Sequence, residues 1–225
     1  MRLVLSALCA LFVMVCVSTR AAQMDTTSAA GLRGKVVAIT LRPRTGVITM
    51  SRAKVSAHGL AGAVAMTQSN KKSAVAENGI EDSAAVVSQA LLLAAQKQYG
   101  AVSAASPVRI DTTDVRQLAQ AAAGADVLFD VQEVEFTYEF IPFKRDQYRV
   151  HSSFKFRIVD VHTGTLMAER SCQQSTKDDP THPSEGELLA NDAALLKQIL
   201  NTQRDQCANQ FETQVLNVAS PLAAR

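Results

Sequence analysis

Two pairs of side chains in the sequence have residue types and a spacing that could support catalysis. Ser69 and Lys72 stand three positions apart, which is the Ser-x-x-Lys spacing of serine acyl-transferases. They lie in a basic stretch of low complexity with no supporting motif, so chance spacing explains them better. Asp160 and His162 could act as an acid–base pair, but an aspartate that caps a turn is much commoner. Neither pair is predicted to be catalytic.

A weak metal site is the third chemical candidate. His182 follows closely on Asp178 and Asp179, and these side chains are common metal ligands. No dense cluster of further ligands supports them. The sequence also lacks a nucleophile-elbow, phosphate-binding, dinucleotide-binding or zinc-protease motif. It therefore predicts no catalytic residues, no metal and no cofactor.

The amino terminus has the pattern of a secretory signal peptide. After a short basic start, residues 3–17 form an apolar run that is too short to span a membrane comfortably, and small residues follow up to Ala21. We expect cleavage after Ala21, which gives a signal peptide over residues 1–21 and a flexible leader over residues 22–31. Lipid attachment at Cys16 is the alternative, but the residue before Cys16 is a bulky valine.

Removal of the signal peptide would change the cysteine count. Cys9 and Cys16 would leave with it, so the mature chain would keep Cys172 and Cys207. Two cysteines in an exported protein usually pair, which predicts a disulfide between them. Metal binding by two thiols without further ligands is the poorer interpretation.

The charges are divided unequally along the chain, although the formal net charge is only +2. Residues 26–76 carry eight basic side chains and no acid, whereas residues 77–225 carry 13 basic and 20 acidic ones. Such asymmetry bears on partners rather than on fold. Aromatic residues make up only 5% of the chain and tryptophan is absent. With export, this argues against nucleic acid as a partner.

Residues 42–79 are predicted to form a long, mobile basic insertion, because they are rich in small residues and poor in large apolar ones. Their charge could attract an anionic lipid or cell-wall surface. Under this hypothesis the binding residues are Arg42, Arg44, Arg52, Lys54, Lys71 and Lys72. The alternative is a solvated loop whose charge only aids solubility.

Three antiparallel strands are predicted over residues 124–172. The second of them alternates most regularly, which indicates one buried and one wet face. Its apolar face carries Tyr148, Val150, Phe154, Phe156 and Ile158, and its polar face carries Arg149, His151, Ser153, Lys155 and Arg157. The third strand, over residues 165–172, follows a turn at Gly164.

The first of the three strands changes parity in its middle. Apolar residues stand at odd positions over 127–131 and at even positions from Val134 onwards. Either a β-bulge near Gln132 and Glu133 restores the pattern, or residues 127–131 are buried on both faces. The acids of this strand are expected opposite the basic face of the next one: Glu133, Glu135 and Glu139.

The remaining elements follow from local signals. A strand is predicted within residues 32–41, a helix over 82–99 that is capped by Asp82 or Ser83 and ends at Gly100, and a short strand over 106–110. A second helix over 113–123 starts at Thr112 or Thr113. Ser184 and Glu187 form a capping-box pattern before a long amphipathic helix. Its predicted apolar stripe is Leu188, Leu195, Ile199, Cys207, Phe211, Val215 and Val218.

These elements predict an α/β (α+β) fold. One mixed sheet of about five strands would carry two packed helices and the long C-terminal amphipathic helix. A single domain is expected over residues 32–218, with the basic insertion at 42–79 and a tail at 219–225.

The element order and two segments resemble the small α/β module of bacterial envelope proteins. The segments are Gly-Ala-Asp-Val-Leu at 124–128 and Phe-Arg-Ile-Val-Asp-Val-His-Thr-Gly-Thr-Leu at 156–166. The group includes curli-secretion-channel-like proteins, lipoprotein activators of penicillin-binding proteins and the N-terminal domain of the Tol translocation protein. Its members are mostly lipoproteins. The basic insertion and the helix that carries Cys207 are additions to its pattern.

The sequence thus favours a non-enzymatic periplasmic accessory or adaptor protein that binds another envelope component. The expected partner is an envelope protein or an anionic cell-wall or lipid surface, with self-association left open. A peripheral position at the outer membrane is compatible with this. The alternative is a periplasmic hydrolase or transferase whose site has no recognisable motif.

Overall fold

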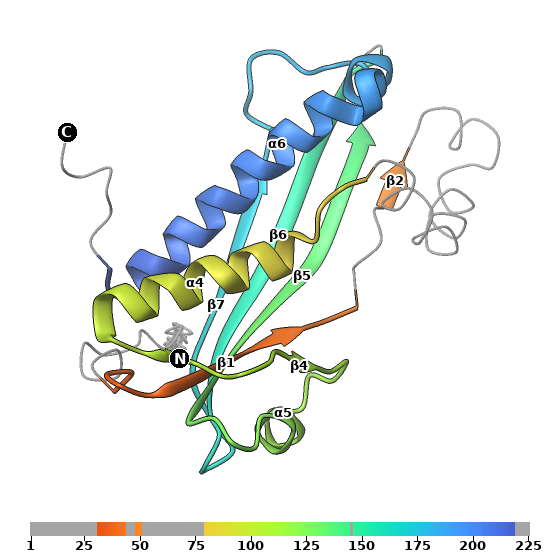
Figure 1. Ribbon diagram of the computed structural model, residues 1–225. Helices are drawn as coiled ribbons and strands as arrows, with labels where there is room; N and C mark the ends of the chain where they lie inside the picture. Colours follow the sequence, from red (N-terminus) through yellow and green to blue (C-terminus); the bar gives the residue numbers. More distant parts are fainter. Residues whose placement is uncertain (1–30, 44–47, 51–78, 145, 219–225) are drawn as a thin grey trace, which may run out of the picture.

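The computed structural model describes residues 31–43, 48–50, 79–144 and 146–218. They form one mixed sheet with helices on both faces (Figure 1). In chain order the elements are β1 (Val36–Leu41), β2 (Ile48–Met50), α4 (Ser83–Tyr99), β3 (Val102–Ser103), β4 (Val108–Arg109), α5 (Val115–Ala121), β5 (Val127–Phe140), β6 (Tyr148–Asp160), β7 (Thr165–Ser175) and α6 (Glu185–Gln214). The predicted α/β class with a long C-terminal helix is confirmed.

The sheet has seven strands, with the main order β3-β1-β5-β6-β7. β1 runs parallel to β3, β4 and β5, whereas β5, β6 and β7 are antiparallel. The short β2 pairs in parallel with the far part of β5. Residues 48–50 of the predicted insertion therefore belong to the sheet. Residues 44–47 and 51–78 lie outside the described residues, so the expected mobility of the insertion stays a prediction.

The change of parity in β5 has both of the causes considered for it, a β-bulge and burial on both faces. The pairing with β6 shifts between Glu133 and Glu135, and the residue between them, Val134, is 54% exposed. This is the predicted bulge. Residues 127–131 are also buried on both faces, since Phe129 packs under α4 and α6 while Leu128 packs against α5.

The helix boundaries follow from capping side chains. Asp82 caps α4 by accepting a hydrogen bond from the Ala85 N–H (3.1 Å), and Gly100 ends it with a φ of 63°, as the sequence predicts. α5 begins later than predicted, because Asp114 rather than a threonine before it accepts from the Gln117 N–H (2.8 Å).

The C-terminal helix is less regular than the sequence indicates. The predicted capping box between Ser184 and Glu187 is present. Residues 190–193, however, leave helical geometry, with φ values of 51°, 56° and 56° over the last three of them. The predicted long helix is therefore present, but with a kink that the sequence analysis did not anticipate. The stripe beyond the kink contains Leu196 and Leu200, which are buried, whereas Leu195 is only half-buried.

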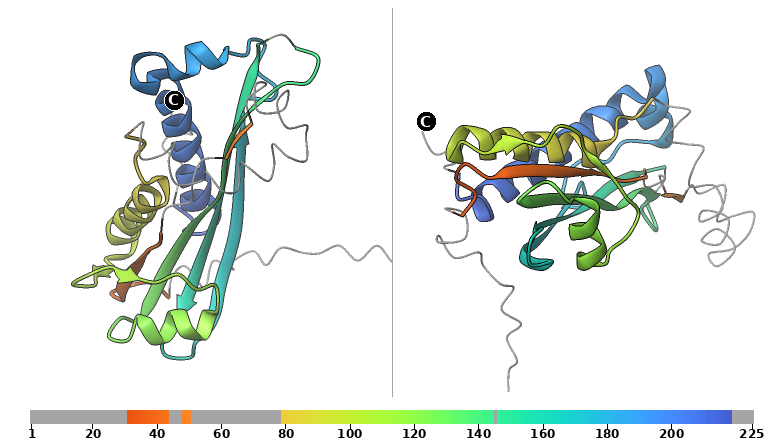
Figure 2. Two further views of the ribbon diagram at one scale, coloured as in Figure 1. Left: turned by 90° about the vertical axis from the view of Figure 1, so that its right-hand side faces the viewer. Right: turned by 60° about the horizontal axis from the view of Figure 1, so that its bottom comes forward.

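α4 and α6 lie together on one face of the sheet, and α5 covers the base of the other face (Figure 2). The core under α4 and α6 is aromatic. Phe156 meets Phe129 edge-on at 5.3 Å between ring centroids and packs against Phe211 of α6 at 5.6 Å. Within the described part of the chain, no helix is both long and apolar enough to cross a membrane.

A disulfide joins the middle of α6 to β7. Cys172 and Cys207 are both buried and their Cα atoms are 5.6 Å apart, as the sequence predicts for a pinned helix. The bond closes a loop between residues separated by 35 positions. By the chain-entropy estimate such a loop lowers the entropy of the unfolded chain enough to add about 4 kcal/mol to stability.

Reduction should therefore destabilise the protein. We expect the free energy of unfolding, measured by urea titration, to fall by about 4 kcal/mol with reductant, and the Cys172→Ala/Cys207→Ala variant to show no further response to reductant. Equal stability of the oxidised and reduced forms would contradict the assigned role of the bond.

Candidate functional site

A buried polar cluster lies at the centre of the sheet, on the face that carries α5. Asp130 of β5 is fully buried, and its carboxylate accepts hydrogen bonds from three side chains. Thr40 Oγ1 donates to Oδ1 at 2.9 Å, and Arg42 Nε donates to the same oxygen at 2.7 Å. Arg157 donates to Oδ2 from Nε at 2.9 Å and from Nη2 at 2.6 Å. One carboxylate thus holds two guanidinium groups.

The far ends of both arginines bind the connection that leads into α5. Arg42 Nη2 donates to the Thr112 carbonyl at 2.6 Å, and Arg157 Nη1 donates to the Thr113 carbonyl at 2.8 Å. The cluster therefore joins β1, β5, β6 and the start of α5. The charged and hydrogen-bonding atoms of these residues bind one another. The cluster therefore links parts of the fold and has a structural rather than a reactive role.

The cluster corrects one predicted binding residue. Arg42 was expected to belong to an exposed basic surface, but its side chain is only 8% exposed and forms an ion pair with Asp130. An arginine held in this way does not reach an external anion. The other predicted binding residues lie outside the described residues: Arg44, Arg52, Lys54, Lys71 and Lys72.

The turn between β6 and β7 shows which partner His162 takes. Asp160 Oδ1 accepts from the Thr163 N–H at 2.8 Å, so the turn-capping interpretation of Asp160 is confirmed. His162 Nε2 instead lies 2.9 Å from Asp126 Oδ1. The other oxygen of Asp126 accepts from the Val36 N–H at 2.8 Å. Asp126 thereby ties the start of β1 to the end of the β6–β7 hairpin.

A surface hollow of about 640 Å³ opens beside this aspartate–histidine pair. Its walls come from α5, the connection into β5 and the β6–β7 turn. Small and apolar residues form much of the lining: Val36, Ala119, Ala123, Gly124, Ala125, Val161 and Gly164. Arg116 of α5 and His162 are the basic side chains of the lining.

The predicted metal candidate is not supported by a ligand cluster. Among the described residues, no three His, Cys, Asp or Glu side chains gather closely enough to hold an ion. The Nδ1 atom of His182 is buried and makes no hydrogen bond to any described residue. We have no functional account of that atom.

The far part of the sheet has a polar face that no described helix covers (Figure 2). Ion pairs cross it between neighbouring strands, from Arg149 to Glu139 at 2.6 Å and from Lys155 to Glu169 of β7 at 3.6 Å. His151 lies 3.9 Å from Glu135, a contact that is an ion pair only when the histidine is protonated. The expectation that β5 acids face the basic side of β6 therefore holds for two pairs, while Lys155 turns to β7.

The connection between β5 and β6 contains a residue that the sequence analysis did not single out. Phe143 is fully exposed and has a φ of 63°. A left-handed conformation costs a non-glycine residue about 1–2 kcal/mol. Two backbone hydrogen bonds hold the connection, from the Lys144 N–H to the Ile141 carbonyl at 3.1 Å and from the Ile141 N–H to the Gln147 carbonyl at 2.8 Å. The apolar run Ile-Pro-Phe at 141–143 was the available sequence signal.

Comparison with known proteins gives solved structures only. No protein-family model and no curated protein matches the chain. A lipoprotein from Neisseria meningitidis is 16% identical, with 74% of this chain and 99% of that chain covered and a TM-score of 0.29. A protein from Xanthomonas campestris is 10% identical, with 83% and 89% covered and a TM-score of 0.39. The C-terminal domain of LpoB from Escherichia coli is 15% identical, with 64% and 84% covered and a TM-score of 0.21. Similarity at this level shows neither a family nor a function.

The central cluster predicts a large effect of a small change. Replacing Asp130 by asparagine removes the charge that compensates two buried guanidinium groups. We expect Asp130→Asn to lower the free energy of unfolding by about 3–5 kcal/mol in urea titration. Asp205→Asn is the matched control, because Asp205 is 64% exposed in its pair with Arg204, and it should cost less than about 1 kcal/mol. Similar losses in both variants would contradict the role of the cluster.

The tie at Asp126 predicts a pH dependence. The hydrogen bond from His162, followed by that from the Val36 N–H, lowers the pKa of Asp126 below its ordinary value of 3.8. A lowered pKa in the folded state adds stability above pH 3.8, and this stability is lost as the pH falls through the folded-state pKa. The stability difference between wild type and Asp126→Asn should therefore be largest near neutral pH and shrink below pH 3.8. A constant difference would contradict the tie.

Proposed function

We propose that this protein is a non-enzymatic accessory or adaptor protein of the bacterial envelope, which works in the periplasm by binding another envelope component. The signal-like amino terminus and the buried disulfide between Cys172 and Cys207 support an exported protein. A stable cystine suits an oxidising compartment, where thiols are not kept reduced.

The observation that carries the proposal is the way the buried charges are used. A catalytic group must come within hydrogen-bond reach of its substrate, whereas Asp130 is fully buried and its carboxylate already accepts four hydrogen bonds from Thr40, Arg42 and Arg157. The ion pairs on the open sheet face are likewise formed between neighbouring side chains. This arrangement supports a protein that acts by binding a partner through its surface.

The alternative of a hydrolase or transferase has one specific place in the structure. Asp126 and His162 stand together beside the 640 Å³ hollow, in the arrangement that orients a histidine base. The hydroxyl in the lining of that hollow is that of Thr163, and its Oγ1 lies 2.8 Å from Thr165 Oγ1 in a hydrogen bond that does not involve His162. The Asp126 carboxylate also accepts a hydrogen bond from the Val36 N–H, which is a structural role. Binding is therefore the better supported function.

We further propose that the basic residues outside the described part of the chain contribute to envelope association. Arg42 is removed from this set because of its bond to Asp130. The remaining set is Arg44, Arg52, Lys54, Lys71 and Lys72. Exposed charges act over about 8 Å at physiological salt, which favours an extended anionic surface over a single buried ion.

The test replaces these five residues with glutamine and measures co-sedimentation with isolated envelopes. We expect weaker association of the variant at low salt and a smaller difference at high salt, because salt screens exposed charges. The fold should be unchanged, as checked by the urea transition.

A charge-matched control keeps the basic segment and removes five other cations. These are exposed or half-buried in the structure and take part in no ion pair with another described residue: Arg33, Lys97, Arg109, Arg170 and Lys177. The control should sediment with envelopes as wild type does. Equal loss in both variants would show a general charge effect and refute the assignment to the basic segment. Absence of wild-type association at any salt concentration would refute the proposed function.

A further inference from the structure

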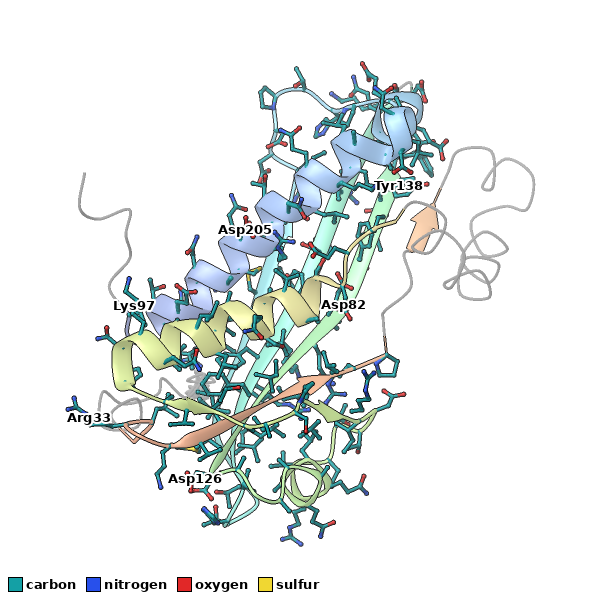
Figure 3. The ribbon with its side chains drawn as sticks, in the orientation of Figure 1. Arg33, Asp82, Lys97, Asp126, Tyr138 and Asp205 are labelled. Atoms are coloured by element: carbon teal, nitrogen blue, oxygen red, sulfur yellow. A yellow bond between two sulfur atoms is a disulfide. The ribbon has the colours of Figure 1, made fainter. Side chains whose placement is uncertain are left out.

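An exposed aromatic residue and a hollow that could receive one lie at opposite ends of the long strands. Figure 3 shows Asp126, which lines the hollow, at one end and Tyr138 towards the other. Phe143 lies beyond Tyr138, in the connection from β5 to β6. The two features cannot meet within one molecule, because β5 and β6 separate them.

Phe143 is presented in a way that suits insertion into a pocket. Its side chain is fully exposed, and two backbone hydrogen bonds, from the Ile141 N–H and from the Lys144 N–H, flank it. Such bonds reduce the conformational freedom that the described part of the connection loses on binding. Asp146 lies three residues further on, is exposed, and forms no ion pair with another described residue.

The hollow beside α5 has the matching properties. About 640 Å³ is ample for a phenyl ring, because a cavity of about 150 Å³ holds benzene. Ala119, Ala123 and Val161 provide an apolar wall. Arg116 stands in the lining, is exposed, and forms no ion pair within the described part of the chain.

We propose that Phe143 of one copy inserts into the hollow beside α5 of a second copy, with Asp146 of the first copy paired to Arg116 of the second. The same sequence supplies the projecting ring, the recess, and a carboxylate and a guanidinium that form no ion pair with another described residue. This complementarity selects a second copy over other occupants. The contact joins unlike ends, so repeated copies form a closed ring or an open filament.

The first test measures assembly of the purified protein by sedimentation over a range of concentrations. Phe143→Ala should weaken self-association at least about tenfold, the size expected for loss of an aromatic anchor. Leu93→Ala is the matched control, since Leu93 of α4 is 55% exposed but lies at neither end of the long strands. It should assemble as wild type does.

The second test reverses the proposed charge pair. Asp146→Arg and Arg116→Asp should each weaken assembly, because each places like charges against one another in the contact. The doubly reversed variant should recover assembly to within about threefold of wild type, since only the order of the charges has changed. Additive losses in the double variant would overturn the pairing.

The third test uses the unlike ends directly. Phe143→Ala retains a working hollow, and Ala123→Phe fills the hollow while leaving the ring of Phe143 in place. Neither variant should assemble alone, whereas an equimolar mixture should give a heterodimer and nothing larger. If Ala123→Phe fails to fold, Arg116→Asp replaces it in the mixture.

A fluorescent reporter separates this contact from other uses of Phe143. The chain contains no tryptophan, so Phe143→Trp introduces a single indole, whose fluorescence is excited selectively over that of the three tyrosines. Its emission should shift to the blue as the protein assembles, and vesicles of phosphatidylethanolamine and phosphatidylglycerol should leave it unchanged. A blue shift with vesicles would identify a membrane anchor and overturn the proposal. So would a wild-type protein that stays monomeric up to about 1 mM.

Discussion

The fold depends on one carboxylate that compensates two guanidinium groups in the interior of the sheet. Asp130 of β5 binds two arginines from different parts of the chain, because Arg42 directly follows β1 and Arg157 belongs to β6. Both arginines also donate hydrogen bonds to the carbonyls that precede α5. Burying such ions costs several kcal/mol each unless partners and hydrogen bonds compensate. The cluster therefore fixes the register of β5. If β5 were shifted by one residue, Asp130 would face the aromatic core and both arginines would be buried without a counter-charge.

The bulge at Val134 divides the sheet into two parts with different environments. Before the bulge β5 is covered on both faces, by α5 on one side and by α4 and α6 on the other. After the bulge, described helices cover only the face towards α6, and the other face carries the Glu139–Arg149 and Glu135–His151 pairs. The disulfide between Cys172 and Cys207 holds α6 against β7 at the level of the bulge, because Cys172 pairs with Phe154 and Phe154 with Glu133. A compact base thus supports a longer part of the sheet that has one polar face.

The sequence predicts what local chemistry determines and misses what distant residues determine. The bulge in β5, the caps at Asp82 and Ser184, and the disulfide all follow from short-range patterns or from the export context. The wet face predicted for β6 is wrong at Ser153 and Arg157, which are 6% and 5% exposed. Asp130 could have been noticed as a lone acid within an apolar strand, but its partner Arg42 comes from a strand 88 positions away. The kink of α6 was not predictable either, because Ala193 has no side-chain property that favours a positive φ. The exposure of Phe143 could not be predicted from the sequence. The segment Ile-Pro-Phe at 141–143 would have the same sequence in a turn that faces the core.

The two edges of the sheet favour assembly through contacts at the ends of the strands over pairing between edge strands. One edge consists of the two-residue strands β3 and β4, interrupted at Pro107, so it offers no continuous ladder. The other edge, β7, has a bulge at Met167 and charged residues at Glu169 and Arg170, which are devices that discourage pairing with another strand. With both edges protected, the most exposed large apolar side chain of the described residues is Phe143, which lies where the chain turns from β5 to β6. The left-handed backbone at Phe143 closes the turn through hydrogen bonds, but its fully exposed ring contributes no buried surface to the isolated fold. Under the proposed contact, the recess of a second copy buries that ring.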